Sequence, residues 1–244
     1  MLSKATITHL QDLKQKKYRQ KYAEFVIAGE KLVTEALLAR TPVKYVIATE
    51  AFQQKNKGLL SSVHVELTDE NTLSRISSLT TVGNAIAVLP HFPTQTVAPE
   101  GKWFFMLDGI SDPGNMGTII RIADWFGMDQ VICTPDCVEL YNPKTVQATM
   151  GALFRVQVEY YDPVSFLAEK KFPVYAASME GENVFSQNDL RPGCILIGSE
   201  SHGIREACMP LITKELHIPG AGRGESLNAA VAAGIIAAQL MHGD

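Results

Sequence analysis

The sequence has no run of apolar residues long enough to cross a membrane. A spanning helix needs about 18 or more consecutive apolar residues, and the nearest candidate, residues 227–240, is rich in alanine and contains Gly234. We expect that segment to be a packed helix and expect no membrane partner. The N-terminus lacks the apolar centre of a secretory signal, and it is rich in lysine rather than arginine and serine, which disfavours an organelle transit peptide. These features favour a cytoplasmic protein.

Cysteine is scarce, and its spacing is not that of a metal site. The four cysteines, Cys133, Cys137, Cys194 and Cys208, lie inside or beside apolar segments, and none belongs to a CxxC pair. The six histidines do not pair at helical spacing. Buried thiols in a reducing compartment are therefore favoured over zinc ligands, and we expect no metal. A chain of 244 residues, 46% of them hydrophobic, can bury a core without such crosslinks.

Charged residues make up only 20% of the chain, but their two signs are unevenly distributed. The net charge is −4, yet residues 1–57 hold 11 Lys and Arg against 5 Asp and Glu, and the rest of the chain holds 11 against 21. This asymmetry makes the N-terminal part a candidate surface for phosphate groups, and the alternative is an ordinary solvated helix face. The basic residues behind this prediction are Lys14, Lys16, Lys17, Arg19 and Lys21.

Three prolines between residues 90 and 101 mark a linker, since this stretch has no helical or strand periodicity. Before it, short β-branched runs alternate with helical patterns, which predicts a small α/β unit. After it, longer apolar strands alternate with helices, which predicts a parallel sheet covered on both faces. We therefore expect one domain at residues 1–92, a linker at 93–101 and an α/β domain at 102–244. The expected strands are residues 25–28, 43–47, 63–67, 85–89, 103–107, 130–134, 155–160, 174–178, 195–198 and 216–218.

The loops after these strands are the places to look for chemistry, because ligands of parallel sheets bind at the carboxyl ends of the strands. The loop after strand 103–107 contains three glycines and Pro113, and it leads into a helix with Arg121 expected four residues from its start. The glycine spacing matches neither GxGxxG nor a P-loop, which argues against a nucleotide-binding oxidoreductase. Arg121 lies between two isoleucines and needs a partner, which is either a structural acid such as Asp124 or a ligand.

Two later loops are also unusual. Glu200 follows strand 195–198 directly and enters a turn bounded by glycine, so a role in a site and a role in helix capping both stay open. After strand 216–218, a glycine-rich loop leads to Ser226 and an alanine-rich helix. Ser226 occupies the expected N-cap position. Asn228 falls inside the expected first turn, where asparagine is a poor helix former and needs partners elsewhere.

Taken in this order, the three loops resemble the three motifs of the SpoU (TrmH-like) RNA methyltransferases of the SPOUT class. The most specific part is Ser226-Leu-Asn228 at the head of an alanine-rich helix. Residues 8–19 and 25–31 are similar to the family's small substrate-binding domain, which resembles a ribosomal protein. The resemblance covers nearly the whole chain. Departures from the family pattern, at Ser199, Gly220, Gly224 and Ala230, leave the catalytic set intact.

The resemblance implies a SPOUT-type parallel sheet with a C-terminal trefoil knot, S-adenosyl-L-methionine bound in the knot, and a homodimer. It also implies methyl transfer to a ribose 2′-hydroxyl, with ribosomal RNA favoured over transfer RNA. The residues that match the family's catalytic set are Asn115, Arg121, Glu200, Ser226 and Asn228. The donor is expected against backbone near Gly198, Ile218 and Leu227, and the basic N-terminal residues are expected to bind RNA.

The implied reaction is an in-line displacement, in which the protein aligns the two reactants within about 3 to 3.5 Å and removes the hydroxyl proton. In the family, the arginine of the first motif is the group assigned to accept that proton. A guanidinium, however, stays protonated in proteins and has no site to accept another proton. We therefore expect Arg121 to bind the adjacent phosphate and stabilise the alkoxide, which leaves the base open. We expect Glu200 to hold Arg121 or the RNA, and Ser226 and Asn228 to bind the ribose.

Three alternatives stay open on the sequence. One is a transfer-RNA 2′-O-methyltransferase, and another is methylation of a base. The third is an RNA-binding protein without catalysis, which the intact catalytic set disfavours. An oxidoreductase is disfavoured by the glycine spacing.

Overall fold

A computed structural model describes residues 2–76, 83–95, 100–169, 171–222, 224 and 226–241 of the chain. Residues 96–99 of the expected linker lie outside these described residues. Contacts between residues divide the chain into two compact units. The first comprises Met1–Pro93 together with Tyr141–Phe154, and the second comprises Thr94–Leu140 together with Arg155–Asp244. The first unit is therefore discontinuous in sequence.

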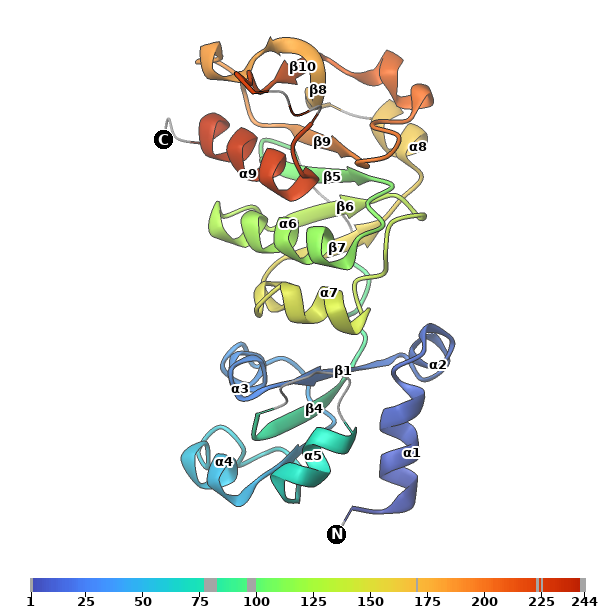
Figure 1. Ribbon diagram of the computed structural model, residues 1–244, viewed down its shortest axis with the longest axis vertical. Helices are drawn as coiled ribbons and strands as arrows, with labels where there is room; N and C mark the ends of the chain where they lie inside the picture. The colour runs from blue at the N-terminus through green and yellow to red at the C-terminus, as the bar shows by residue number, and fades with distance from the viewer. Residues whose placement is uncertain are drawn as a thin grey trace. The chain divides into compact units, whose positions relative to one another are not determined.

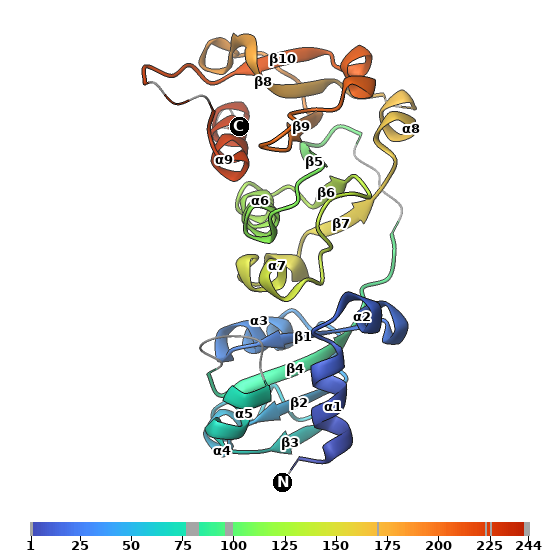
Figure 2. The same ribbon diagram turned by 45° about the vertical axis from the view of Figure 1, so that its right-hand side comes forward.

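The first unit is built on a four-stranded mixed sheet (Figure 1), and Figure 2 labels its strands in the order β1-β4-β2-β3. Strand β4 pairs antiparallel with both β1 and β2, and β3 runs parallel to β2. The strands are β1 (Glu24–Ala28), β2 (Tyr45–Ala48), β3 (Val65–Leu67) and β4 (Ala85–Pro90). The helices are α1 (Lys4–Asp12), α2 (Lys16–Tyr22), α3 (Glu30–Leu38), α4 (Glu50–Lys55), α5 (Glu70–Ile76), α7 (Pro143–Ala148) and the short η1 (Ala152–Phe154).

Helices α1 and α5 cover one face of this sheet. Leu10 and Leu13 from the α1 region join Leu73 of α5 in one buried cluster with Ile47 and Val88 of the strands. Helix α3 packs against β1 and β4. Alternate residues of a strand point to opposite faces, so a sheet with nearly every central residue buried has helices on both sides.

Aromatic rings tie the distant segment Tyr141–Phe154 to the rest of the first unit. The ring of Tyr141 stacks on His91 with centroids 4.0 Å apart, and it also contacts Phe25 of β1. The Tyr141 hydroxyl accepts a hydrogen bond from the backbone N–H of Phe92 at 2.8 Å. No local sequence pattern predicts this return of the chain, because the partners lie about fifty residues apart or more.

The second unit is an α/β domain with six strands in the order β10-β8-β9-β5-β6-β7. Every neighbouring pair is parallel, which confirms the predicted parallel sheet. The strands are β5 (Phe104–Asp108), β6 (Gln130–Cys133), β7 (Gln157–Tyr160), β8 (Val174–Asn183), β9 (Cys194–Gly198) and β10 (Lys214–His217). The helices are α6 (Pro113–Trp125), α8 (Pro163–Ala168), α9 (Ala229–Leu240), and the short η2 (Val184–Ser186) and η3 (Glu206–Leu211).

Helices cover both faces of this second sheet. Figure 2 shows α6 and α9 on one side and α8 on the other. Phe104 and Met106 of β5 pack with Leu167 of α8 and Cys208 of η3 in one cluster, and α6 and α9 contact each other and the sheet. All four cysteines are buried as thiols. Among the described residues, no helix combines the length and the hydrophobicity that a bilayer crossing requires.

Candidate active site

Three side chains far apart in sequence, each following a different strand, meet at one edge of the parallel sheet. Asn115 follows β5, Glu200 follows β9, and Asn228 follows β10. The Asn115 Nδ2 donates to Glu200 Oε1 at 3.0 Å, and the Asn228 Nδ2 donates to the same oxygen at 2.8 Å and to Asn115 Oδ1 at 2.8 Å. We call these three residues the polar triad. The predicted meeting of the three loops is thus present in the geometry.

The start of α6 places Asn115 within the triad. The helix begins at Pro113, and the Asp112 carboxylate caps it by accepting from the Asn115 backbone N–H at 2.7 Å. An acidic N-cap followed by proline is a strong start signal. The expectation that Arg121 lies four residues into the helix is therefore wrong, because the helix starts earlier and Arg121 is its ninth residue.

The N-cap of α9 is Asn228, not Ser226. The Asn228 Oδ1 accepts from the backbone N–H groups of Ala230 and Val231 at 3.0 and 3.2 Å. Its Nδ2 can therefore donate to the triad, so one side chain both caps the helix and builds the site. Ser226 is exposed and has no hydrogen bond with any described residue.

Glu200 accepts its hydrogen bonds on one oxygen. Its Oε1 receives Asn115, Asn228 and the backbone N–H of Ala229 at 3.3 Å. The Oε2 atom makes no hydrogen bond with the described residues. The carboxylate is therefore fixed in orientation through Oε1, and because the residue is exposed we call Oε2 its outward oxygen.

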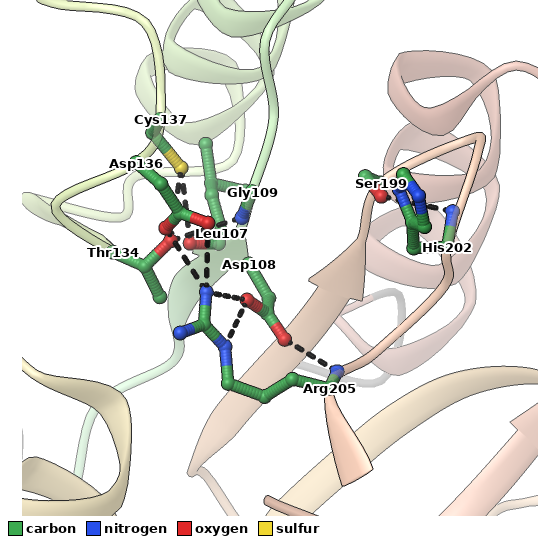
Figure 3. A network of polar contacts seen from close by, with 9 residues as sticks. All are labelled: Leu107, Asp108, Gly109, Thr134, Asp136, Cys137, Ser199, His202 and Arg205. Atoms are coloured by element: carbon green, nitrogen blue, oxygen red, sulfur yellow. Dashed lines mark hydrogen bonds and ion pairs between the residues drawn. The ribbon is translucent and has the colours of Figure 1, made fainter. Parts of the chain in front are cut away.

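A tight turn after β9 presents Glu200. Ser199 and Gly203 form an antiparallel bridge, and the Ser199 Oγ accepts from the His202 backbone N–H at 3.2 Å (Figure 3). A side chain at Gly198 would collide with the backbone of Gly203 at 2.3 Å. Glycine is thus required at residue 198 by close backbone approach, which explains why the loop can fold back on its own strand.

An arginine ties the end of this loop to the neighbouring strand, as Figure 3 shows. The Arg205 Nε donates to Asp108 Oδ1 at 2.6 Å, and the Arg205 backbone N–H donates to Asp108 Oδ2 at 2.7 Å. The Arg205 Nη2 also reaches the Asp136 carboxylate at 2.9 and 3.1 Å. Asp108 is buried and pairs directly with Gly198 in the sheet. The loop that carries Glu200 therefore starts next to Asp108 at Gly198 and is bound to Asp108 again at Arg205.

Electrostatics in this network favour the charged forms. A hydrogen bond from the Thr134 hydroxyl, followed by the Arg205 guanidinium, holds the pKa of Asp136 below its ordinary value. The hydrogen bond from Arg205 to Asp108 raises the pKa of Arg205 above its ordinary value. Sequence reasoning missed Asp108, Asp136 and Arg205. Asp108 could have been found by the argument used for Glu200, since it is a carboxylate at the end of a buried strand.

Arg121 does not join the triad within one chain. It is exposed and has no hydrogen bond or ion pair with a described residue, and Asp124 pairs instead with Arg155 at 2.7 Å. Arg121 lies six positions after Asn115, which is about 9 Å along the helix and on a different face. The structural alternative, an ion pair between Arg121 and Asp124, is therefore absent from the described part of the chain.

The residues expected beside the methyl donor are each at least partly exposed. Leu227 is 47% exposed, and Gly198 and Ile218 are half-buried. Beside them in sequence, the His217 Nδ1 is buried and has no hydrogen-bond partner among the described residues. An exposed apolar side chain and a ring nitrogen without a partner are the kinds of group that the base face and the polar edge of a nucleoside satisfy.

The basic residues of the first unit divide into two groups. Lys14, Lys16, Lys17 and Lys21 are exposed. Arg19 is only 4% exposed, and its Nη1 donates to the carbonyl oxygens of Leu13 and Lys14 at 2.9 and 2.8 Å. Arg19 therefore joins α2 to the end of α1, and in this arrangement it cannot contact an RNA phosphate, contrary to the prediction from the charge distribution.

Two family models match the chain. The SpoU rRNA Methylase family matches residues 102–238, and the MRM3-like substrate binding domain matches residues 4–87. The first match holds the whole polar triad, and the second holds the exposed lysines.

Individual relatives match over nearly the full length. The chain is 29% identical over 225 residues to the 23S rRNA (guanosine(2553)-2′-O)-methyltransferase RlmP of Bacillus subtilis, covering 91% of this chain and 90% of that protein. A TrmH-family structure from Porphyromonas gingivalis has a TM-score of 0.87 and 33% identity, with full coverage of both chains. The AdoMet-bound rRNA methyltransferase of Sinorhizobium meliloti has a TM-score of 0.86 and 26% identity, covering 98% of this chain and 95% of that one.

Proposed function

We propose that this chain, which belongs to the SpoU rRNA methylase family, transfers a methyl group from S-adenosyl-L-methionine to a ribose 2′-hydroxyl of ribosomal RNA. The relative in Bacillus subtilis is named for that reaction, and a related structure holds AdoMet. The single observation that carries the proposal in this chain is the polar triad, in which residues that follow three different strands meet around one carboxylate at the sheet edge.

The donor, when bound, supplies a methyl group on a sulfonium, which is a good leaving group. The chain's own residues have two remaining tasks, alignment and removal of the hydroxyl proton. We propose that Gly198, Ile218 and Leu227 contact the donor, since each is at least partly exposed and lies close in sequence to Glu200 or Asn228 or follows β10. The knot in which the donor binds is part of this proposal.

Glu200 is the acidic member of the triad, and we propose that it acts through its outward oxygen. Because Oε1 is held by three N–H donors, Oε2 is available to the ribose hydroxyl or to an arginine. Asn115 and Asn228 then fix the carboxylate, and Ser226, whose hydroxyl is exposed, binds the ribose. Arg121 binds the neighbouring phosphate and stabilises the developing alkoxide, because a guanidinium offers donors and no acceptor.

A homodimer is part of the proposal, because one chain does not bring Arg121 to its own triad. A second copy can supply it. Trp125 of α6 is 84% exposed and Val231 of α9 is 50% exposed, and we propose that a second chain covers these large apolar side chains.

Mixing two inactive variants tests this dimer. Arg121→Ala and Glu200→Gln are each expected to lose nearly all activity, but a heterodimer of the two contains one site with both residues intact. After co-refolding at equal amounts, about a quarter of the wild-type activity is expected if dimers form at random. No recovered activity in heterodimers isolated with two different tags would exclude a shared site.

We propose that the RNA substrate-binding domain, residues 1–92, is joined by the linker at 93–101 to the methyltransferase domain at 102–244. The family matches at residues 4–87 and 102–238 support this division, although by its contacts the segment Tyr141–Phe154 belongs to the first compact unit. The exposed lysines 14, 16, 17 and 21 supply affinity for phosphates that is independent of sequence. Four buried thiols support a reducing compartment such as the cytoplasm.

The proposed function is tested by methyl transfer in vitro. Ribosomal RNA from cells that lack the gene is incubated with the protein and radiolabelled donor, with transfer RNA and DNA as parallel substrates. Label on ribosomal RNA is expected at a ribose that resists alkaline cleavage, because 2′-O-methylation removes the attacking hydroxyl, and DNA should stay unlabelled. Label in transfer RNA alone, or on a base, would replace the proposed substrate.

A further inference from the structure

We propose that two tyrosines and two lysines of α2 form a platform on which unpaired nucleotides of the RNA substrate stack. The platform comprises Lys17, Tyr18, Lys21 and Tyr22. This inference rests on the proposed function, which supplies RNA as the substrate. It adds that the first unit selects unpaired RNA.

The two rings lie one helical turn apart and face each other. Tyr18 and Tyr22 have ring centroids 6.1 Å apart and planes inclined by 12°. The Lys17 ammonium lies 4.7 Å from the centroid of the Tyr18 ring, and the Lys21 ammonium lies 5.3 Å from that of Tyr22. Each ring thus has a cation at its face, and the four side chains form one array of alternating charge and aromatic surface.

The array is held in place from the inner side of the helix. Helix α2 has only seven residues, which is too short to be stable alone. Buried Arg19 attaches it to the end of α1 through the carbonyls of Leu13 and Lys14, and Ala23 ends it in the left-handed conformation at a φ of 51°. The His9 ring packs edge-on against Tyr22 with centroids 4.9 Å apart. The outer side is therefore ordered before any ligand binds.

This chemistry matches unpaired RNA better than duplex RNA or an acidic peptide. Aromatic rings bind a base through its flat face, and a duplex hides those faces within its stack. The flexible lysine side chains can turn from the rings to phosphates when a base replaces them. An acidic peptide would need the lysines alone and would gain nothing specific from two parallel rings.

The test measures binding of the full chain to two labelled probes, an unpaired adenosine 12-mer and an RNA duplex with the same number of phosphates. Tyr18→Leu and Tyr22→Leu are each expected to weaken binding to the unpaired probe about tenfold, or about 1.4 kcal/mol. Binding to the duplex should stay unchanged, and Tyr22→Phe, which keeps the ring, should bind as the wild type does. Phe185→Leu, an exposed aromatic position in the second unit, is the matched control.

Salt dependence separates stacking from charge. The tyrosine variants should keep the slope of log affinity against log salt, because they release no counterions, whereas Lys17→Ala and Lys21→Ala should reduce that slope with both probes. Equal losses of affinity on both probes for the tyrosine variants would overturn the platform. So would unchanged binding to the unpaired probe, or tyrosine-dependent binding of an acidic peptide in place of RNA.

Two measurements keep the outcome clear. If a leucine variant is unstable, Tyr22→Trp replaces it, and its added fluorescence should be quenched by the unpaired probe and not by the duplex. Methyl transfer by the wild-type protein is measured in parallel. If the wild-type protein methylates ribosomal RNA but the tyrosine variants bind the unpaired probe normally, the platform is refuted and the proposed function stands. If the wild-type protein transfers no methyl group, the proposed function itself is refuted.

Discussion

The two units of the molecule build their functional surfaces in opposite ways. On α2, the groups that order the surface are close in sequence, since Arg19 reaches back to Leu13 and Lys14 and His9 packs against Tyr22. In the second unit, Asn228 and Asn115 are 113 residues apart, and Arg205 and Asp108 are 97 apart. A local surface can lose one residue and keep the others in place, whereas a convergent site depends on every loop that enters it. We therefore expect variants of the second unit to change turnover and variants of the first to change RNA affinity.

The largest expected effect comes from Glu200→Gln. Glutamine keeps one oxygen as the acceptor for the three N–H donors, but it replaces the other carboxylate oxygen with an uncharged NH2 group, which donates and does not accept. Methyl transfer at saturating RNA is expected to fall about 100-fold, with RNA affinity unchanged. Single-turnover assays and RNA binding measure the two effects, and Ser201→Ala, at the exposed neighbouring residue, is the control. An equal fall in RNA affinity would break the contrast between the two units.

The next effect is on stability, from Asp108→Asn. Asp108 is buried and receives both the guanidinium and the backbone N–H of Arg205. Removing its charge leaves Arg205 partly unpaired, and we expect the free energy of unfolding to fall by about 2 kcal/mol. Urea denaturation of the full chain measures this change, and exposed Asp189→Asn is the control. Donor affinity should also fall, because the Glu200 loop is no longer anchored at its far end.

A smaller effect distinguishes the two roles of Asn228. Asn228→Ser keeps an N-cap acceptor for α9 but removes the donor to Glu200 and Asn115. We expect a stability close to the wild type and a rate reduced about tenfold, as for the removal of one charge-assisted hydrogen bond. Asn228→Ala should in addition cost about 1 kcal/mol of stability, because the cap is removed. Identical rates for wild type and Asn228→Ser would show that the triad does not act as one group.

The smallest effect is expected from the first unit. Lys16→Ala should lower the slope of log affinity against log salt by about 1 if Lys16 neutralises one phosphate. The rate at saturating RNA should stay the same, since Lys16 is exposed and contributes only affinity. Titrations between low and high salt measure the slope, and Lys57→Ala, outside α1 and α2, is the control. A change in the methyl-transfer rate at saturating RNA would contradict the expectation that variants of the first unit alter RNA affinity alone.

The positions of the strands could be predicted from the sequence, because apolar and β-branched runs are local signals. Expected strand 195–198 and observed β9 (Cys194–Gly198) differ by one residue at the start. Helix starts are predicted less well. Helix α6 begins at Pro113, ahead of the apolar residues that suggested a later start, and Asn228 rather than Ser226 caps α9.

Contacts between distant residues could not be predicted from the residues alone. Nothing near Arg205 indicates that its partner is Asp108, and nothing near Arg19 indicates that it is buried. The meeting of Asn115, Glu200 and Asn228 could be predicted by resemblance and by the rule that loops gather at the carboxyl ends of parallel strands. Their individual hydrogen bonds follow from loop geometry, which no local pattern specifies.

The discontinuity of the first unit bears on how the chain matures during translation. Its first 93 residues leave the ribosome well before Tyr141–Phe154. The rings of Phe25 and His91 therefore lack their contact with Tyr141 until that residue has been synthesised. A fragment cut at the proline-rich linker would leave these rings permanently uncovered. If the first unit ended at residue 92, it could fold as soon as that residue was synthesised. Because it also needs residues up to Phe154, nascent chains shorter than about 154 residues should stay accessible to proteases and chaperones for longer.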